Sequence, residues 1–252
     1  MALLSTIRDL HRRKGRERRG LALAEGVRLV EEMLVAEAPC KGFAHSPALG
    51  TTPRGARLRQ RLLATGVLMQ EISDVELTAV AATEHPQGIV AVYQTRMWSL
   101  DECAAVPRRP LVILDGVQDP GNVGTIARTA WAFGAAGLIA LPGTADLTNP
   151  KSVRSAIGAL FQLPHCHAAA ADALTMLLRH DVLLWAMDVN GEPLDRTTPA
   201  GPLALLLGNE GAGIRPELRE RAARRVTIPI LPGAESLNVA VAAGIALHQV
   251  TR

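Results

Sequence analysis

Apolar residues in the second half of the chain gather in short unbroken runs, followed by segments of helical spacing. The runs contain Val, Ile and Leu without polar alternation, which is typical of strands buried on both faces of a parallel sheet. We predict strands at 111–115, 137–141, 182–187, 203–207 and 225–229. We predict helices at 122–133, 150–158, 170–179, 216–222 and 237–249. Strands that alternate with helices indicate an open α/β domain.

The first half of the chain has a less regular alternation. Residues 24–38 carry apolar side chains at helical spacing, and 53–63 predicts a basic helix. Short strands are expected at 41–46 and 88–93, and Ser73–Glu76 has the pattern of a capping box at a helix start. We therefore expect a small α/β domain at 1–95, a polar linker at 96–109 that contains prolines, and a larger α/β domain at 110–252.

Composition narrows the class of protein. Hydrophobic residues make up 48% of the 252 residues, enough to bury a core. No uninterrupted apolar segment reaches about 18 residues, and the N-terminal charges follow a short apolar stretch, so we expect neither a membrane span nor a secretory signal. We expect a cytoplasmic protein. Three cysteines lie far apart without a C-x-x-C pair, and His165 and His167 lack a third ligand, so we expect no metal site.

Positive charge is concentrated near the N-terminus. Residues 1–61 hold 13 Lys+Arg against 6 Asp+Glu, whereas the remainder of the chain is net acidic. A solvated helix face or a loose arm would explain such a run, but contact with RNA phosphates is favoured, because phosphate neutralisation dominates nucleic-acid affinity. Aromatic residues at 3% give little support for base stacking. The candidate RNA contacts are Arg12, Arg13, Lys14, Arg16, Arg18 and Arg19.

A glycine-rich turn follows the first strand of the larger domain, in LVILDGVQDPGNVGTIARTA. A strand, a glycine turn and a helix are typical of a nucleotide phosphate site. However, the spacing of Gly116, Gly121 and Gly124 is not that of the dinucleotide fingerprint, and no Walker lysine follows. Asn122 is expected to cap the helix after a turn, which places Arg128 about one and a half turns into it.

Two further motifs carry polar residues beside apolar strands. LALLLGNEGAGI ends a strand in a loop with three glycines and the charged Glu210. VTIPILPGAESLNVAVAAGIALHQ runs from a strand into a loop and then into an almost wholly apolar helix. Ser236 and Asn238 stand at the start of that helix, where they are either ordinary caps or part of a site.

Taken together, these residues resemble the SpoU (TrmH-like) family of RNA ribose 2′-O-methyltransferases. Its three motifs occur in order as Asn122–Thr129, Leu207–Gly211 and Ile228–Val239. The first block resembles the substrate-binding domain that many of these enzymes carry, through Ala24-Glu25-Gly26 and Pro86-Gln87-Gly88. That domain is similar in fold to ribosomal RNA-binding proteins.

The resemblance implies a cofactor, a fold and partners. S-adenosyl-L-methionine is expected in a deep trefoil knot of the C-terminal loops, held mainly by backbone and apolar contacts. The resemblance also implies a homodimer through the C-terminal domain and an RNA substrate, with 23S rRNA favoured over tRNA. The residues that carry over to the cofactor are Leu207, Gly208, Asn209, Gly211, Ile228, Pro229, Leu237 and Asn238.

The chemistry that the resemblance implies suggests roles for the polar set. Arg128 stays protonated at neutral pH, so we expect it to bind an RNA phosphate and to stabilise charge on the attacking 2′-oxygen. The phosphate itself is a candidate proton acceptor. The residues expected to orient these groups are Asn122, Glu210, Ser236 and Asn238.

Arg154, in the helix after Asn149–Pro150, is expected to lie near the RNA entrance, with a structural cap as the alternative. Three other functions are alternatives to this one. A tRNA methyltransferase is the alternative within the class. A non-catalytic RNA-binding or ribosome assembly factor is disfavoured because the polar set is complete. A nucleotide-dependent oxidoreductase lacks its glycine fingerprint.

Overall fold

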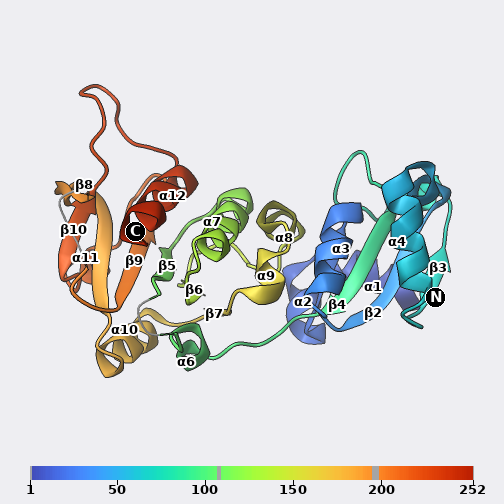
Figure 1. Cartoon of the computed structure of the whole chain (residues 1–252), viewed down its shortest axis with the longest axis horizontal. Coiled ribbons are helices and arrows are strands. Elements are labelled where there is room, and N and C mark those ends of the chain that lie inside the picture. The colour runs from blue at the N-terminus through green and yellow to red at the C-terminus, as the bar shows by residue number, and fades with distance from the viewer. Residues whose placement is uncertain (1, 107–108, 195–198, 252) are drawn as a thin grey trace. The chain divides into compact units, whose positions relative to one another are not determined.

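The computed structural model describes residues 2–106, 109–194 and 199–251. The chain divides into two compact units (Figure 1). The smaller unit comprises Met1–Arg96 together with Thr148–Phe161, and the larger unit comprises Met97–Leu147 and Gln162–Arg252. Within the described residues, no helix has the length and hydropathy that a bilayer crossing requires.

The smaller unit is built on a four-stranded mixed sheet in the order β1-β4-β2-β3. Strands β1 and β2 run antiparallel to β4, and β3 runs parallel to β2. Its first helix packs Leu3, Ile7 and Leu10 into the core at helical spacing. The elements are α1 (Ala2–Leu10), α2 (Arg13–Arg19), β1 (Leu21–Glu25), α3 (Val27–Val35), β2 (Cys40–His45), the 3₁₀ helix η1 (Pro47–Thr51), α4 (Pro53–Leu63), β3 (Met69–Glu71), α5 (Asp74–Thr78) and β4 (Ile89–Gln94).

The predicted helix at 24–38 is shorter than expected, and its first residues belong to β1, a strand that the pattern did not indicate. Gly26 has φ 98, which separates the strand from the helix and favours glycine. The side-chain oxygen of Gln87 accepts from the backbone N–H of Val27 over 3.0 Å. The two sequence signatures of this domain, which are 60 residues apart, therefore meet at the start of α3. The capping box at Ser73 and Glu76 is confirmed.

The segment Thr148–Phe161, which includes helix α8 (Pro150–Ala156) and most of α9 (Ala159–Gln162), packs within the smaller unit. The ring of Phe161 meets Tyr93 edge-on, with the ring centroids 5.0 Å apart. Thr148 Oγ1 accepts from Arg16 Nε over 3.1 Å. A segment from the middle of the chain thus completes the N-terminal unit.

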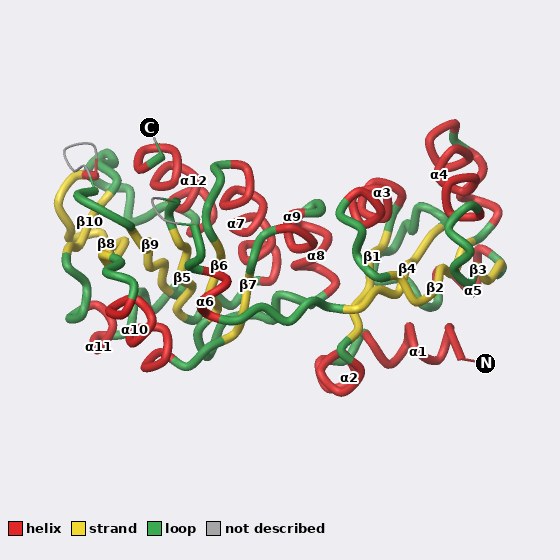
Figure 2. Tube along the Cα trace, turned by 60° about the horizontal axis from the view of Figure 1, so that its bottom comes forward, coloured by secondary structure: helices red, strands yellow, loops and turns green. Residues whose placement is uncertain are grey.

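The larger unit is a parallel six-stranded sheet in the order β10-β8-β9-β5-β6-β7. Figure 2 shows α7 and α12 on one face of this sheet and α6, α10 and α11 on the other. The elements are α6 (Leu100–Cys103), β5 (Leu111–Asp115), α7 (Pro120–Ala132), β6 (Gly137–Ala140), β7 (His165–His167), α10 (Ala170–Arg179), β8 (Leu183–Pro193), β9 (Leu203–Gly208), α11 (Pro216–Arg219), β10 (Arg224–Thr227) and α12 (Val239–Val250).

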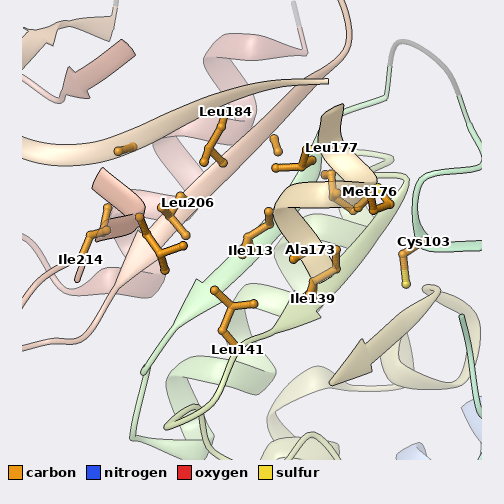
Figure 3. Packing of buried hydrophobic residues seen from close by; sticks show 14 residues of the cluster. Cys103, Ile113, Ile139, Leu141, Ala173, Met176, Leu177, Leu184, Leu206 and Ile214 are labelled. Atoms are coloured by element: carbon orange, nitrogen blue, oxygen red, sulfur yellow. The ribbon is translucent and has the colours of Figure 1, made fainter. Parts of the chain in front are cut away.

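Along the central strands, successive side chains point to opposite faces of the sheet. Ile113 and Leu206 point with Met176 and Leu177 of α10 into one hydrophobic cluster (Figure 3). Leu114, next to Ile113, is equally buried and belongs to the other face. Burial on both faces explains why these strands lack polar alternation, and the predicted parallel α/β fold is confirmed. The trefoil knot stays a prediction.

Two predicted helix starts were wrong. Helix α7 begins at Pro120, because the carboxylate of Asp119 caps it and accepts from the backbone N–H of Gly121 and Asn122. Asn122 is therefore not the cap but a residue of the first turn. Helix α12 begins at Val239 rather than 237, because Asn238 is its N-cap and accepts from Ala240 over 2.9 Å.

Candidate active site

A pocket of about 770 Å³ opens beside the carboxyl ends of β8, β9 and β10 in the larger unit. Open parallel sheets bind their ligands at this edge. Its walls combine apolar side chains such as Leu207 and Ile230 with exposed backbone of the glycine loop and with the acids Asp188 and Glu235. The lining segments are 187–190, 207–214, 226–228, 235–239 and the single residues Arg219, Ile230 and Ala242.

The glycine loop after β9 forms one wall of this pocket, and Asn209 holds its shape. Asn209 Oδ1 accepts from the backbone N–H of Gly211 and Ala212, while Nδ2 donates to the carbonyl of Gly116 over 2.8 Å. Gly208 permits a close backbone approach, because a Cβ there would lie 2.4 Å from the carbonyl carbon of Gly213. The loop therefore closes tightly on itself and on the end of β5.

An ion pair between a buried carboxylate and a partly exposed arginine anchors the far end of the same loop. Asp115, the last residue of β5, has a side chain that is only 1% exposed. Its carboxylate accepts from the backbone N–H of Arg215 over 2.8 Å and from Arg215 Nε over 2.7 Å. Arg215 follows Ile214 of the pocket wall directly. The pair therefore ties the glycine loop to the strand beside it with two charge-assisted bonds.

Side-chain hydrogen bonds connect the three sequence motifs at the rim of the pocket. Asn122 Nδ2 of the first motif donates to Glu210 Oε1 of the second over 2.9 Å. Asn238 Nδ2 of the third donates to Asn122 Oδ1 over 3.1 Å. Glu210 also accepts from the backbone N–H of Gln118 and Asp119. The chain Glu210–Asn122–Asn238 thus brings together residues that are up to 116 positions apart.

The environment of Glu210 favours its ionised form. Partial burial raises the pKa of this carboxyl, but the hydrogen bonds from the Asn122 side chain and from the backbone N–H of Gln118 and Asp119 outweigh it. The pKa of Glu210 is therefore below its ordinary value of 4.5. A carboxylate that is ionised and fully engaged at neutral pH is suited to holding Asn122 in one orientation.

Helices α7 and α12 lie side by side and run in the same direction. Asn122 contacts Asn238 at their N-terminal ends, and the ring of Phe133 lies 5.6 Å from that of His248 near their C-terminal ends. Between these points Thr129 faces Gly244, where a Cβ would lie 3.5 Å from the threonine methyl. The small residue at 244 lets the two helices approach.

Arg128 lies on α7 six residues beyond Asn122, roughly 9 Å along the helix. Its side chain is exposed and makes no hydrogen bond or ion pair with any residue that the structure describes. It does not line the pocket. The structure therefore leaves Arg128 available to a ligand but outside the pocket wall.

Most of the residues predicted to bind the cofactor do line the pocket. Pro229 does not. Three of the predicted catalytic residues, Glu210, Ser236 and Asn238, line it as well. Four further residues were not predicted from the sequence: Asp188 and Arg219 in the pocket wall, and the pair Asp115 and Arg215 beside it. The only signal in the sequence was that Asp115 and Asp188 stand at the ends of predicted strands. The predicted residues in the pocket wall are Leu207, Gly208, Asn209, Gly211, Ile228, Leu237 and Asn238.

The basic cluster near the N-terminus is partly used within the protein. Arg16 is 4% exposed, and its Nη1 donates to the carbonyls of Leu10 and His11 at the end of α1. It therefore caps a helix, and little of its side chain is exposed to a ligand. Arg18 and Arg19 both pair with Asp9 at 2.7 Å.

The other predicted RNA contacts differ in their surroundings. Arg13 pairs with Glu17 at 2.7 Å, whereas Arg12 and Lys14 are exposed without a partner among the described residues. Arg154 belongs to α8 and hence to the smaller unit, and its Nη1 is buried without a hydrogen-bond acceptor in the described part of the chain. Its guanidinium is therefore only partly open to solvent.

Comparison with known proteins gives matches to both units. Residues 109–248 match the SpoU rRNA Methylase family, and residues 4–91 match the MRM3-like substrate binding domain. The 23S rRNA (guanosine(2553)-2′-O)-methyltransferase RlmP of Bacillus subtilis is 34% identical, covering 96% of this chain and 93% of its own.

Solved structures agree with these matches. The SpoU methyltransferase AviRb of Streptomyces viridochromogenes, in complex with the cofactor AdoMet, has a TM-score of 0.87 at 28% identity, covering 100% of this chain and 97% of its own. The AdoMet-bound rRNA methyltransferase of Sinorhizobium meliloti has a TM-score of 0.84 at 30% identity, covering 98% and 93%.

The parallel sheet, the pocket at its strand ends and these relatives define an RNA 2′-O-ribose methyltransferase. The chain belongs to the SpoU rRNA methylase family and carries the MRM3-like domain at its N-terminal end.

Proposed function

We propose that this protein transfers the methyl group of S-adenosylmethionine to a ribose 2′-hydroxyl of 23S rRNA in the cytoplasm. The observation that carries the proposal is the hydrogen-bonded chain Glu210–Asn122–Asn238 at the rim of the pocket, because it joins all three family motifs at one place. A relative that covers 96% of this chain and is named as a 23S rRNA methyltransferase favours this substrate over tRNA, and a second relative with such a name covers 77%.

The pocket suits S-adenosylmethionine in its chemistry. Apolar side chains such as Ile228 and Leu237 provide surfaces for an adenine ring, and the glycine loop offers backbone groups without side chains in the way. The three acids Asp188, Glu210 and Glu235 outnumber the one cation Arg219 in the described pocket lining, and this negative balance favours a ligand that carries a sulfonium cation. The residues that hold the cofactor are proposed to be those of the pocket wall, with Pro229 outside it.

The cofactor, when bound, would supply an electrophilic methyl group attached to a positively charged sulfonium sulfur. The protein must position the weakly nucleophilic ribose 2′-hydroxyl and stabilise the charge that develops on its oxygen. Arg128 cannot take the proton, since a guanidinium stays protonated, but it can bind the phosphate beside the ribose. Asn122 and Asn238, held by the ionised Glu210, orient the polar groups of the rim, and Ser236 adds a hydroxyl there.

The N-terminal domain, proposed to span 1–95 with a linker at 96–109, positions the RNA. The match to a substrate-binding domain supports this role. Contacts to phosphates are proposed for Arg12, Arg13, Lys14, Arg18, Arg19 and Arg154, with Arg16 withdrawn from this set.

We also propose a homodimer through the C-terminal domain. Two neighbouring helices expose large apolar side chains: Trp131 on α7 is 42% exposed, and Val241 and Ile245 on α12 are 52% and 42% exposed. Val241 and Ile245 are four residues apart and so share one face of α12. Sedimentation of the variant carrying Val241→Glu and Ile245→Glu should show monomers. Leu178→Glu is the matched control, because Leu178 is 80% exposed on α10 and should leave the dimer intact.

The main experiment measures transfer of labelled methyl from S-adenosylmethionine to purified rRNA and tRNA, followed by mapping of alkali-resistant linkages. We expect one labelled linkage in 23S rRNA. Label in tRNA alone would establish the alternative substrate. Label at a base rather than a ribose would contradict the proposed chemistry, and cofactor binding without transfer to any RNA would support a non-catalytic RNA-binding factor instead.

A further inference from the structure

Two of the three cysteines meet inside the larger unit, although they are 63 residues apart in the sequence. Cys103 ends α6 and Cys166 is the middle residue of β7, the edge strand of the parallel sheet. Their sulfur atoms are 3.8 Å apart. Neither the methyl-transfer site nor the RNA contacts use this pair, so its chemistry is unassigned.

Close packing holds Cys103 in place. Gly137 begins β6 beside it, and a Cβ at Gly137 would lie 2.7 Å from the carbonyl oxygen of Cys103. The absence of a side chain at 137 therefore lets α6 approach the sheet and directs the thiol toward the next strand, β7. Figure 3 shows Cys103 at one edge of the hydrophobic cluster that includes Ile139 and Met176.

The two thiols differ in accessibility. Cys103 is fully buried, whereas Cys166 on the edge strand is partly exposed. Cys103 donates its S–H to Cys166, and this hydrogen bond raises the pKa of Cys103 and lowers that of Cys166. The thiol with more thiolate character therefore belongs to the more exposed of the two residues, and the thiolate is the form that reacts with oxidants.

We propose that Cys103 and Cys166 form a reversible disulfide when the protein meets a hydroperoxide such as hydrogen peroxide. The thiolate of Cys166 attacks one peroxide oxygen, the O–O bond breaks, and Cys166 becomes a sulfenic acid. The sulfur of Cys103 then attacks the Cys166 sulfur, loses its proton and displaces water. In total two thiols give up two electrons and two hydrogens, and one hydrogen peroxide becomes two waters.

A disulfide bond needs about 2.05 Å between the sulfurs, so the two sulfurs must approach each other from 3.8 Å. The bond would close a loop from α6 to β7 that contains α7, the helix of Asn122 and Arg128. Oxidation would therefore crosslink the chain on both sides of a catalytic helix.

The test treats the reduced full-length protein with hydrogen peroxide, alkylates the remaining thiols under denaturing conditions and maps the peptides by mass spectrometry. We expect a linked Cys103–Cys166 peptide, an intact mass lower by two hydrogen atoms, and full reversal by a phosphine reductant. Cys40 should remain a free thiol, because it lies in β2 of the smaller unit, without either of the other cysteines as a partner.

Two variants distinguish a specific Cys103–Cys166 disulfide from unspecific oxidation of the cysteines. Cys40→Ser should form the same linked peptide, whereas Cys166→Ser should leave the buried Cys103 reduced. Over-oxidation of Cys166 to a sulfinic acid without crosslinking, or a disulfide that includes Cys40, would overturn the proposal. The wild-type peptide map does not depend on the folding of any variant, and methyl-transfer activity before oxidation reports separately on the proposed function.

Discussion

The side-chain amide of Asn238 donates to Oδ1 of Asn122 across 3.1 Å and so joins the N-terminal ends of α12 and α7. Asn238 performs a second task with its other atom, because its Oδ1 caps α12 by accepting from Ala240 and Val241. One residue therefore both starts a helix and orients its neighbour at the rim of the pocket.

These two tasks of Asn238 are separable by mutation. Asn238→Asp keeps a good N-cap but loses the amide donor to Asn122, so we expect near-normal stability with a lower kcat. Asn238→Ala loses both and should also destabilise the protein by about 1 kcal/mol. Urea unfolding and single-turnover methyl transfer measure the two effects. Equal kcat in wild type and Asn238→Asp would show that the bond to Asn122 has no catalytic role.

Lowering the pH should protonate Glu210 and so weaken the hydrogen-bonded chain Glu210–Asn122–Asn238. Its folded pKa is lowered, so the stabilisation is fully present above the ordinary value of 4.5 and is lost as the pH falls through the folded pKa. The variant Glu210→Gln retains one acceptor oxygen but cannot titrate. We expect its thermal unfolding temperature to fall less steeply than that of wild type over this acidic range, and parallel curves would contradict the assignment.

Replacing Arg128 should affect chemistry and not cofactor binding. Arg128 is exposed and outside the pocket wall, so Arg128→Ala should bind S-adenosylmethionine with an unchanged Kd. Its kcat should fall by about 100-fold or more, as when an oxyanion donor is removed. Calorimetry and methyl transfer test this pair of results. Arg128→Lys keeps the positive charge but lacks the planar guanidinium with its paired N–H donors. It should recover part of the kcat that Arg128→Ala loses.

The ion pair between the buried Asp115 and the partly exposed Arg215 is expected to support cofactor binding, because it anchors the loop that forms the pocket wall. Asp115→Asn weakens both bonds to Arg215, each of which contributes about 1.5–3 kcal/mol when charge-assisted. The Kd for S-adenosylmethionine should rise about tenfold or more, while kcat at saturation changes little. Glu217→Gln is the control, since its carboxylate lies 3.8 Å from Arg215 and is exposed. An equal rise in Kd for Asp115→Asn and Glu217→Gln would contradict the proposed role of Asp115 in cofactor binding.

RNA affinity should depend on the unpaired cations near the N-terminus. Arg12 and Lys14 are exposed and have no partner among the described residues, so Arg12→Ala with Lys14→Ala should weaken binding. The slope of log K against log salt should fall by about 1.8, because each phosphate contact contributes about 0.9.

The matched control for that prediction removes Arg57 and Arg61, which are equally exposed and unpaired among the described residues but lie on α4. This control variant removes two positive charges from the smaller unit, as Arg12→Ala with Lys14→Ala does. Filter binding over a salt series compares the two double variants. An equal loss in both would mean that RNA responds to overall charge and not to the predicted cluster.

The amino-acid sequence by itself determined the class of fold and the set of polar residues at the rim. Strands at 111–115 and 203–207 were visible because residues buried on both faces must be continuously apolar. The three motifs were visible because glycine, proline and amide residues have local conformational roles that leave a pattern in the chain.

Only the tertiary structure decided how these residues are used. Asn122 and Asp119 are both good N-caps, but Asp119 caps α7, while the side chain of Asn122 bonds to Glu210, which comes 88 residues later. Arg16 has the same local sequence character as Arg18, yet it is buried because α1 and Thr148 surround it. Contacts between distant segments leave no local period in the sequence, since their partners are chosen by packing, and this is why the burial of Arg16 and the pairing of Asp115 with Arg215 emerged only in three dimensions.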